Sequence, residues 1–334
     1  MRSLRLFPYV SATLSFLLIA RIALCQIHGP RFRFDNQGNG NVNQEDLPET
    51  PEQRQNDLHW GFHEALMLAR LVAVTFSPCE PAYLRYFKPE EAVFVRNAFY
   101  TIANIPLDGP PPDPTDINQF ISGFGQNQVN PKFDLLTISI NDNSAIGRYE
   151  PMCSVMPGFQ AYFEQRVDEL GPPGFMSVCD YAFSHPSLAD IENPPAWARD
   201  PTGAPEPGYG CDNLLDHDND YMISLSGIML HELFHWTYLF EDIPQFDHFI
   251  ALDEELIRVI DDWKGPFPPD GYGPFHAMLV NTLPMQPLVA FPSTNNADNY
   301  VYYALSKWWS FKCQRAFGPA VDEDDGYRHD YPRY

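Results

Sequence analysis

The sequence His-Glu-Leu-Phe-His at residues 231–235 places two histidines four positions apart, with an acidic residue directly after the first. Residues four apart lie on one face of an α-helix, so the imidazoles of His231 and His235 can point at the same ion. Glu232 lies one position round the helix, near such an ion but not bound to it, where it can take a proton from a water molecule. The pattern therefore predicts a zinc site with a general base beside it.

The residues around this motif predict the helix that carries it. Residues 221–240 read YMISLSGIMLHELFHWTYLF, an apolar run without proline, and three aspartates precede it, at positions 216, 218 and 220. Acidic side chains favour the start of a helix. The alternative is a buried helix with two ordinary histidines. Two imidazoles and a carboxylate are costly to bury without partners, which favours a metal site.

A zinc site of this kind needs a third protein ligand, and the sequence leaves more than one class of candidate. The His-x-x-Gly-x-x-His continuation that would supply a third histidine is absent. A thermolysin-like site would use a glutamate about 20 residues downstream, where Glu254 and Glu255 occur. The remaining option is an aspartate, and Asp261, Asp262 and Asp270 lie in the following segment.

The N-terminal sequence indicates a secreted protein. Residues 1–25 contain two early arginines, an apolar stretch and a small-residue site, which is the pattern of a secretory signal peptide. We expect this segment to be removed and the mature protein to be extracellular. No later stretch is long and apolar enough to span a membrane. The formal net charge of -23 disfavours nucleic acid and anionic membranes as partners.

The cysteines support the same compartment. Cys25 belongs to the predicted signal peptide, and no Cys-x-x-Cys spacing occurs among the other five. These are Cys79, Cys153, Cys179, Cys211 and Cys313. In an oxidising compartment they predict two disulfides and one remaining thiol, with about 15 arrangements left open.

The rest of the chain is expected to form one domain. Residues 26–55 are rich in Asn, Gln, Gly and charge, which predicts a flexible lead-in or a pro-segment. Residues 58–76 have apolar side chains at helical spacing, and residues 132–142 read as a strand. We expect an α+β metallopeptidase domain over residues 56–317, mainly helical with a small sheet. A disordered acidic tail follows at residues 318–334.

Three segments resemble the aspzincins, the deuterolysin-like and lysine-specific metalloendopeptidases secreted by fungi. The segments are LHELFHW at 230–236, VIDDWKGPFPPDGYGPFHAML at 259–279 and NNADNYVYYALSKWW at 295–309. Order and spacing agree over residues 221–310. The resemblance implies a zincin-like fold, with the His-Glu-x-x-His motif on the active-site helix and an aspartate as the third zinc ligand.

The second segment departs from the compact family motif, Gly-Thr-x-Asp-x-x-Tyr-Gly. No Gly-Thr precedes an aspartate here, and a proline-rich insertion separates the aspartate from Tyr272. Longer relatives with Ile-x-Asp, a loop and Tyr-Gly-Pro align Asp262 as the ligand, with Asp261 and Asp270 as near alternatives. The resemblance also implies that Tyr272 donates to the oxyanion of the tetrahedral intermediate, which a phenol O–H can do. Asp298, in an Asn-Ala-Asp stretch typical of a helix cap, is expected to be structural or to support a ligand.

The sequence thus predicts a secreted, monomeric metalloendopeptidase that hydrolyses proteins or peptides. Zn²⁺ is held by His231, His235 and Asp262, with Glu232 as general base and Tyr272 as oxyanion donor. The alternative is a secreted zinc-binding or adhesive protein that keeps the fold without turnover. Glu232 favours the enzyme, because a protein that only captures metal needs no general base.

Overall fold

The computed structural model describes residues 29–34, 50–123, 129–142, 151–156, 158–165, 173–253, 256–285 and 289–322. The predicted signal peptide, most of the predicted acidic tail, and Glu254 and Glu255 lie outside these ranges. Within them, none of the helices combines the length and the apolar character that a membrane span requires.

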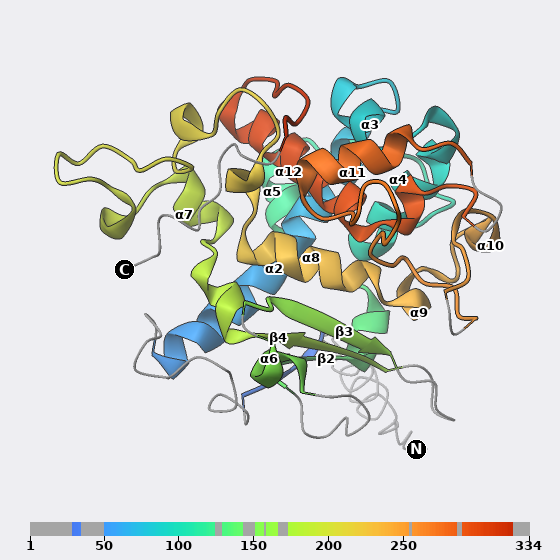
Figure 1. The fold of residues 1–334 in the computed structure, drawn as a ribbon, viewed down its shortest axis with the longest axis horizontal. Helices are drawn as coiled ribbons and strands as arrows, with labels where there is room; N and C mark the ends of the chain where they lie inside the picture. The colour runs from blue at the N-terminus through green and yellow to red at the C-terminus, as the bar shows by residue number, and fades with distance from the viewer. Residues whose placement is uncertain are drawn as a thin grey trace, which may run out of the picture.

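The described chain is an α+β fold with a small sheet, which confirms the coarse part of the predicted fold class (Figure 1). The strands are β1 (Arg31–Arg33), β2 (Leu136–Ile140), β3 (Ala161–Gln165) and β4 (Gly174–Val178). The α-helices are α2 (Pro51–Thr75), α3 (Pro81–Tyr86), α4 (Ala92–Ile102), α5 (Ile117–Ser122), α6 (Met152–Val155), α7 (Leu188–Glu192), α8 (Leu225–Phe234), α9 (Thr237–Phe240), α10 (Phe246–Phe249), α11 (Gly273–Thr282) and α12 (Ala297–Cys313).

The strands form one mixed sheet in the order β1-β2-β4-β3. Strands β1, β2 and β4 run parallel, and β3 is an antiparallel edge strand. Every residue of β2 is buried, because the strand is covered on both faces. The predicted strand at 132–142 is therefore β2, preceded by the short 3-10 helix Pro131–Leu135.

The long helix α2 supports the helix that carries the motif. It begins with a capping box, in which Thr50 and Gln53 each accept a hydrogen bond from the other's backbone N–H. It packs directly against α8 at Gly61, where an added Cβ would lie 3.0 Å from the sulfur of Met229. Figure 1 shows α2 and α8 between the sheet and the pair α11 and α12. Helix α8 is thus held from both sides.

Two parts of the predicted 26–55 lead-in have regular structure. Arg31–Arg33 forms the edge strand β1, and α2 begins at Pro51. The ring of Phe32 lies 3.9 Å from the ring of His59 and 6.2 Å from that of Phe62. Composition predicted flexibility here, whereas backbone hydrogen bonds with β2 and the packing of the partly buried Phe32 order the strand.

Two disulfides confirm the number predicted from the cysteines. Cys153 pairs with Cys179, and Cys211 pairs with Cys313 at the end of α12. Of the cysteines that the structure describes, Cys79 is free and exposed. Two disulfides are typical of a protein from an oxidising compartment.

Candidate metal centre

The motif lies on α8, a helix in which every residue is buried. Its cap is Ser224, whose hydroxyl accepts from the Gly227 amide at 3.2 Å. The acids predicted to start the helix have other roles. Asp218 pairs with Arg85 at 2.6 Å and accepts from the Tyr86 hydroxyl at 2.8 Å. Helix α8 begins at Leu225, later than the start at residue 221 that the sequence predicts.

The same helix also ends earlier than its sequence predicts. It stops with His235 at its C-cap, and the chain resumes as the short helix α9. The interruption falls at Trp236, which is fully buried and packs on the rings of Phe133 and Phe163. His235 therefore lies at the exit of α8, where its side chain faces the loop that arrives from residues 258–262.

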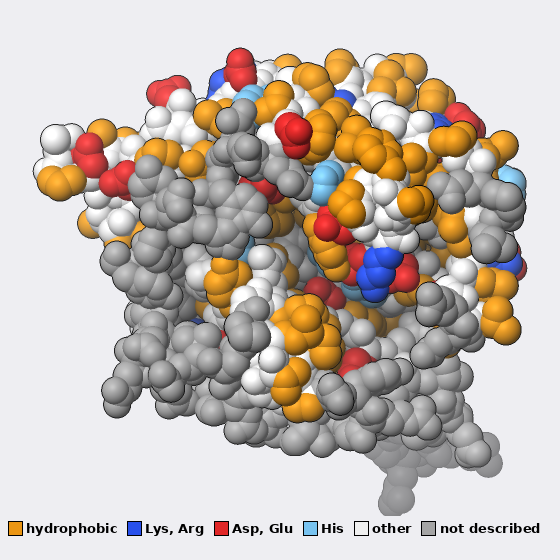
Figure 2. Space-filling model, in the orientation of Figure 1, with side chains coloured by type: hydrophobic (Ala, Val, Ile, Leu, Met, Phe, Trp, Pro, Cys, Tyr) orange, Lys and Arg blue, Asp and Glu red, His pale blue; other side chains and the backbone are white. Residues whose placement is uncertain are grey.

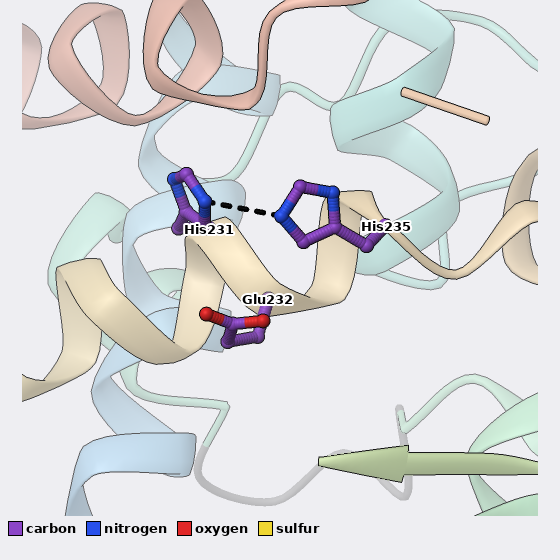
Figure 3. Close-up of side chains that lie close together, drawn as sticks. All are labelled: His231, Glu232 and His235. Atoms are coloured by element: carbon purple, nitrogen blue, oxygen red, sulfur yellow. Dashed lines mark hydrogen bonds between the residues drawn. The ribbon is translucent and has the colours of Figure 1, made fainter. Parts of the chain in front are cut away.

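Three potential ligand atoms meet beside α8. The Nε2 atoms of His231 and His235 lie 3.1 Å apart (Figure 3). Oδ1 of Asp262 lies 3.0 Å from Nε2 of His231 and 3.6 Å from Nε2 of His235. Ligand atoms at the corners of a tetrahedron around zinc, with bonds near 2.0 Å, are separated by about 3.3 Å. The three atoms therefore suit coordination of a single ion.

The opposite nitrogens of the two imidazoles are already bonded. Nδ1 of His231 lies 2.6 Å from Oδ1 of Asp298, and Nδ1 of His235 lies 2.7 Å from the Ile260 carbonyl. An acceptor at Nδ1 holds a ring proton there, so that each imidazole in its neutral form would present the lone pair of Nε2 to the centre. Metal-bound histidines commonly have this arrangement.

Asp262 directs one carboxylate oxygen towards the two imidazoles. Its Oδ2 accepts a hydrogen bond from the Tyr272 hydroxyl at 2.8 Å. Among the described residues, Oδ1 is buried without a well-formed hydrogen bond and lies beside the two imidazoles. A buried carboxylate oxygen needs positive charge beside it, which a cation between it and the imidazoles, or a proton on His231, would supply. The donor set of two imidazoles and one carboxylate therefore fits a divalent metal.

The charges of the centre are mutually dependent. Burial lowers the pKa of His231, but Asp262 and Asp298 outweigh burial and hold that pKa well above its ordinary value. Burial raises the pKa of Asp262, yet the two histidines outweigh it and hold that pKa below its usual range. A cation or protons can therefore balance the carboxylates.

Glu232 lies next to the three atoms without joining them. One ligand atom from each of His231, Glu232 and His235 lies within 4.8 Å of the others, a looser separation than that between the imidazoles. Its side chain is buried, and Oε2 has no hydrogen-bond partner in the part of the chain that the structure describes. Burial raises the pKa of Glu232, and the two histidines oppose that rise. The position suits a general base better than a ligand.

Tyr272 lies at the open side of the centre. Half of its side chain is exposed, and its ring stacks on His231 with centroids 6.1 Å apart. Burial and Asp262 raise the pKa of the phenol, so it stays protonated and can donate. Its donation goes to Asp262 in this conformation. Figure 2 shows a hollow near the middle of the face seen in Figure 1, over α8, with acidic and histidine side chains visible inside.

The other candidate ligands have different partners. Oδ1 of Asp261 accepts from the backbone N–H of Asp262 at 2.8 Å, and Oδ1 of Asp270 pairs with Nδ1 of His276 at 2.7 Å. Neither belongs to the group of three atoms, and Glu255 lies outside the described residues. The Ile260 carbonyl could not be found from the sequence, because a backbone acceptor carries no residue-type signal.

Comparison of the chain with protein-family models, with curated proteins and with solved structures found no match.

Proposed function

We propose that this protein is a secreted zinc-dependent metalloendopeptidase with a zincin-like fold. His231, His235 and Asp262 would hold the ion, and Glu232 would act as general base. The observation that carries the proposal is the meeting of one oxygen of Asp262 with both Nε2 atoms, while both Nδ1 atoms are bonded outwards. The two disulfides support an extracellular location.

The donor set favours a metal such as zinc over calcium and magnesium. Imidazole nitrogen suits zinc, whereas calcium and magnesium take oxygen ligands. Three protein ligands leave a fourth position open, as in catalytic zinc sites. A bound zinc ion would polarise the substrate carbonyl and lower the pKa of a water molecule.

The chain's own residues would then carry the protons. Glu232 would take a proton from the water that attacks the peptide carbonyl and would pass it to the leaving amine as the C–N bond breaks. Its buried carboxylate and raised pKa suit a group that must first accept and then give a proton. Asp298 and the Ile260 carbonyl would keep the two imidazoles in the tautomer that faces the ion.

Tyr272 would supply the donor to the developing oxyanion. To do so, its hydroxyl must leave Oδ2 of Asp262 and turn towards the substrate carbonyl oxygen. The half-exposed side chain leaves room for that movement. The second candidate function is a secreted zinc-binding protein without turnover. The hydrogen bond from Tyr272 to Asp262 also suits this function, because it leaves the phenol O–H with no substrate to donate to.

Digestion of casein separates these two functions. We expect the purified mature protein to cut casein, to lose that activity with a chelator, and to regain it when zinc is added back. Retained zinc with no cleavage of casein or of a peptide library would favour the zinc-binding protein. Cleavage that is indifferent to the chelator would overturn the proposal.

A further inference from the structure

Asn296 occupies the position immediately before α12, where a capping side chain is favoured. Asparagine is among the preferred residues there, yet its side chain makes no capping bond to its own helix. The residue is only 1% exposed. A buried amide needs hydrogen-bond partners, so this side chain has been directed to another part of the chain.

Its partners lie on the segment that carries Asp262. Oδ1 of Asn296 accepts from the backbone N–H of Trp263 at 3.0 Å, and Nδ2 donates to the Gly271 carbonyl at 3.0 Å. One side chain therefore bonds both ends of the proline-rich loop 263–271. The second hydrogen of Nδ2 goes to Oδ1 of Asn299 at 2.7 Å. Because Trp263 can only donate here and Gly271 can only accept, the amide has one possible orientation.

The backbone next to Asn296 adds a third bond to the same segment. The N–H of Ala297 donates to the Asp261 carbonyl at 3.0 Å. The residues directly before and after Asp262 are thus both bonded to the start of α12 at 296–297. Contact with the far end of the loop is close as well, because a Cβ on Gly271 would lie 2.3 Å from Oδ1 of Asn296.

The first turn of α12 also orients a second proposed ligand. Oδ1 of Asp298 lies 2.6 Å from Nδ1 of His231, and Oδ2 accepts from the N–H of Gly273 at 2.7 Å. Residues 296–298 therefore link the position of Asp262 to that of His231. Three ligand atoms must keep separations near 3 Å to share one ion, so small shifts of the loop would spread them.

We propose that Asn296 is a positioning residue for the metal centre, which sets Asp262 by bonding both ends of loop 263–271. This inference rests on the proposed function. Asn296 acts through the backbone of Trp263 and Gly271 and contacts none of the three ligand atoms. Removing its side chain would free the loop and leave every proposed ligand in the sequence.

The chain offers a matched control in Asn295. Its side chain is also buried, accepts from the Ala251 N–H at 2.7 Å, and donates to the carbonyls of Phe249 and Phe291 at 2.7 Å each. Asn295→Ala therefore removes a similar set of buried bonds without touching loop 263–271. The two variants separate loss of positioning from loss of stability.

Zinc affinity of the two variants would be measured by competition with a chromophoric chelator, at a temperature where both are folded. We expect Asn296→Ala to weaken zinc binding about 10–100-fold, the range for groups that orient a metal ligand, and Asn295→Ala to keep the parent's affinity. The visible absorption of the cobalt-substituted protein should change only in Asn296→Ala. Hydrogen exchange at the Trp263 amide should accelerate in Asn296→Ala and not in Asn295→Ala, with or without metal.

The outcomes separate this inference from the proposed function. Equal zinc affinities and equal cobalt spectra for the two variants, in a parent that binds zinc, would overturn the role of Asn296 alone. A folded parent that binds no zinc would overturn the proposed function and this inference with it. If Asn296→Ala does not fold, Asn296→Ser takes its place under the same expectations, because it changes the same bonds with a smaller loss of polarity.

Discussion

Replacement of Asp262 by alanine should empty the proposed metal centre. The carboxylate supplies one of the three atoms that meet beside α8, and its Oδ1 lies 3.0 Å and 3.6 Å from the two Nε2 atoms. Removing it leaves two imidazoles. Groups that only orient a ligand cost about 10–100-fold in affinity, so loss of a ligand should exceed about 100-fold, which corresponds to more than about 2.8 kcal/mol.

Two neighbouring aspartates provide controls for this measurement. Asp261 is exposed and accepts from the backbone N–H of Asp262, and Asp270 pairs with His276. Asp261→Ala and Asp270→Ala should keep most of the zinc affinity, measured by chelator competition at fixed free zinc. Glu255→Ala should keep nearly all of it. If Glu255→Ala empties the site while Asp262→Ala does not, the assignment of the third ligand is refuted and a thermolysin-like site takes its place.

Two further predictions concern buried carboxylates. Glu232→Gln should keep zinc but lower peptide hydrolysis by at least about 10²-fold, the low end for loss of a general base; a fully active variant would identify another residue as the base. Burial raises the pKa of Glu64 from 4.5 to about 7, so the folded state favours the protonated carboxyl. The stability that comes from this preference is fully present below pH 4.5, and it is lost as the pH rises through about 7. At about 1.4 kcal/mol per pKa unit, the difference between 4.5 and about 7 corresponds to at most about 3.5 kcal/mol of stability. Urea unfolding between pH 4.5 and 8 should therefore show a smaller fall in stability for Glu64→Gln than for the parent, and equal falls would contradict this role of Glu64.

The local sequence pattern was sufficient to predict that the two histidines lie together, but it did not predict where their helix begins and ends. The spacing of His231 and His235 predicts that both side chains share one helical face, and in the structure their Nε2 atoms lie 3.1 Å apart. The limits of that helix depend on distant residues. Arg85 and Tyr86 bind Asp218, which was expected to lie at the start of the helix, and burial of Trp236 coincides with its end.

Long-range contacts account for what the sequence left open. Periodicity cannot set the register of Asp262 across a proline-rich insertion. Its neighbours are held by the hydrogen bond that Trp263 donates to Asn296 and by the one that Ala297 donates to Asp261. The three-residue strand β1 receives its backbone bonds from β2, about a hundred residues later in the chain. The number of disulfides followed from cysteine count and compartment, whereas their pairing required the fold.

The zinc ligands proposed for this protein can be tested by measuring the metal content of the purified mature protein together with X-ray absorption at the zinc edge. We expect about one zinc per chain, two imidazole nitrogens and at least one oxygen at about 2.0–2.2 Å, and loss of that ion in Asp262→Ala. A folded protein that takes up no zinc, or a zinc ion whose surroundings are the same in the parent and in Asp262→Ala, would contradict this assignment.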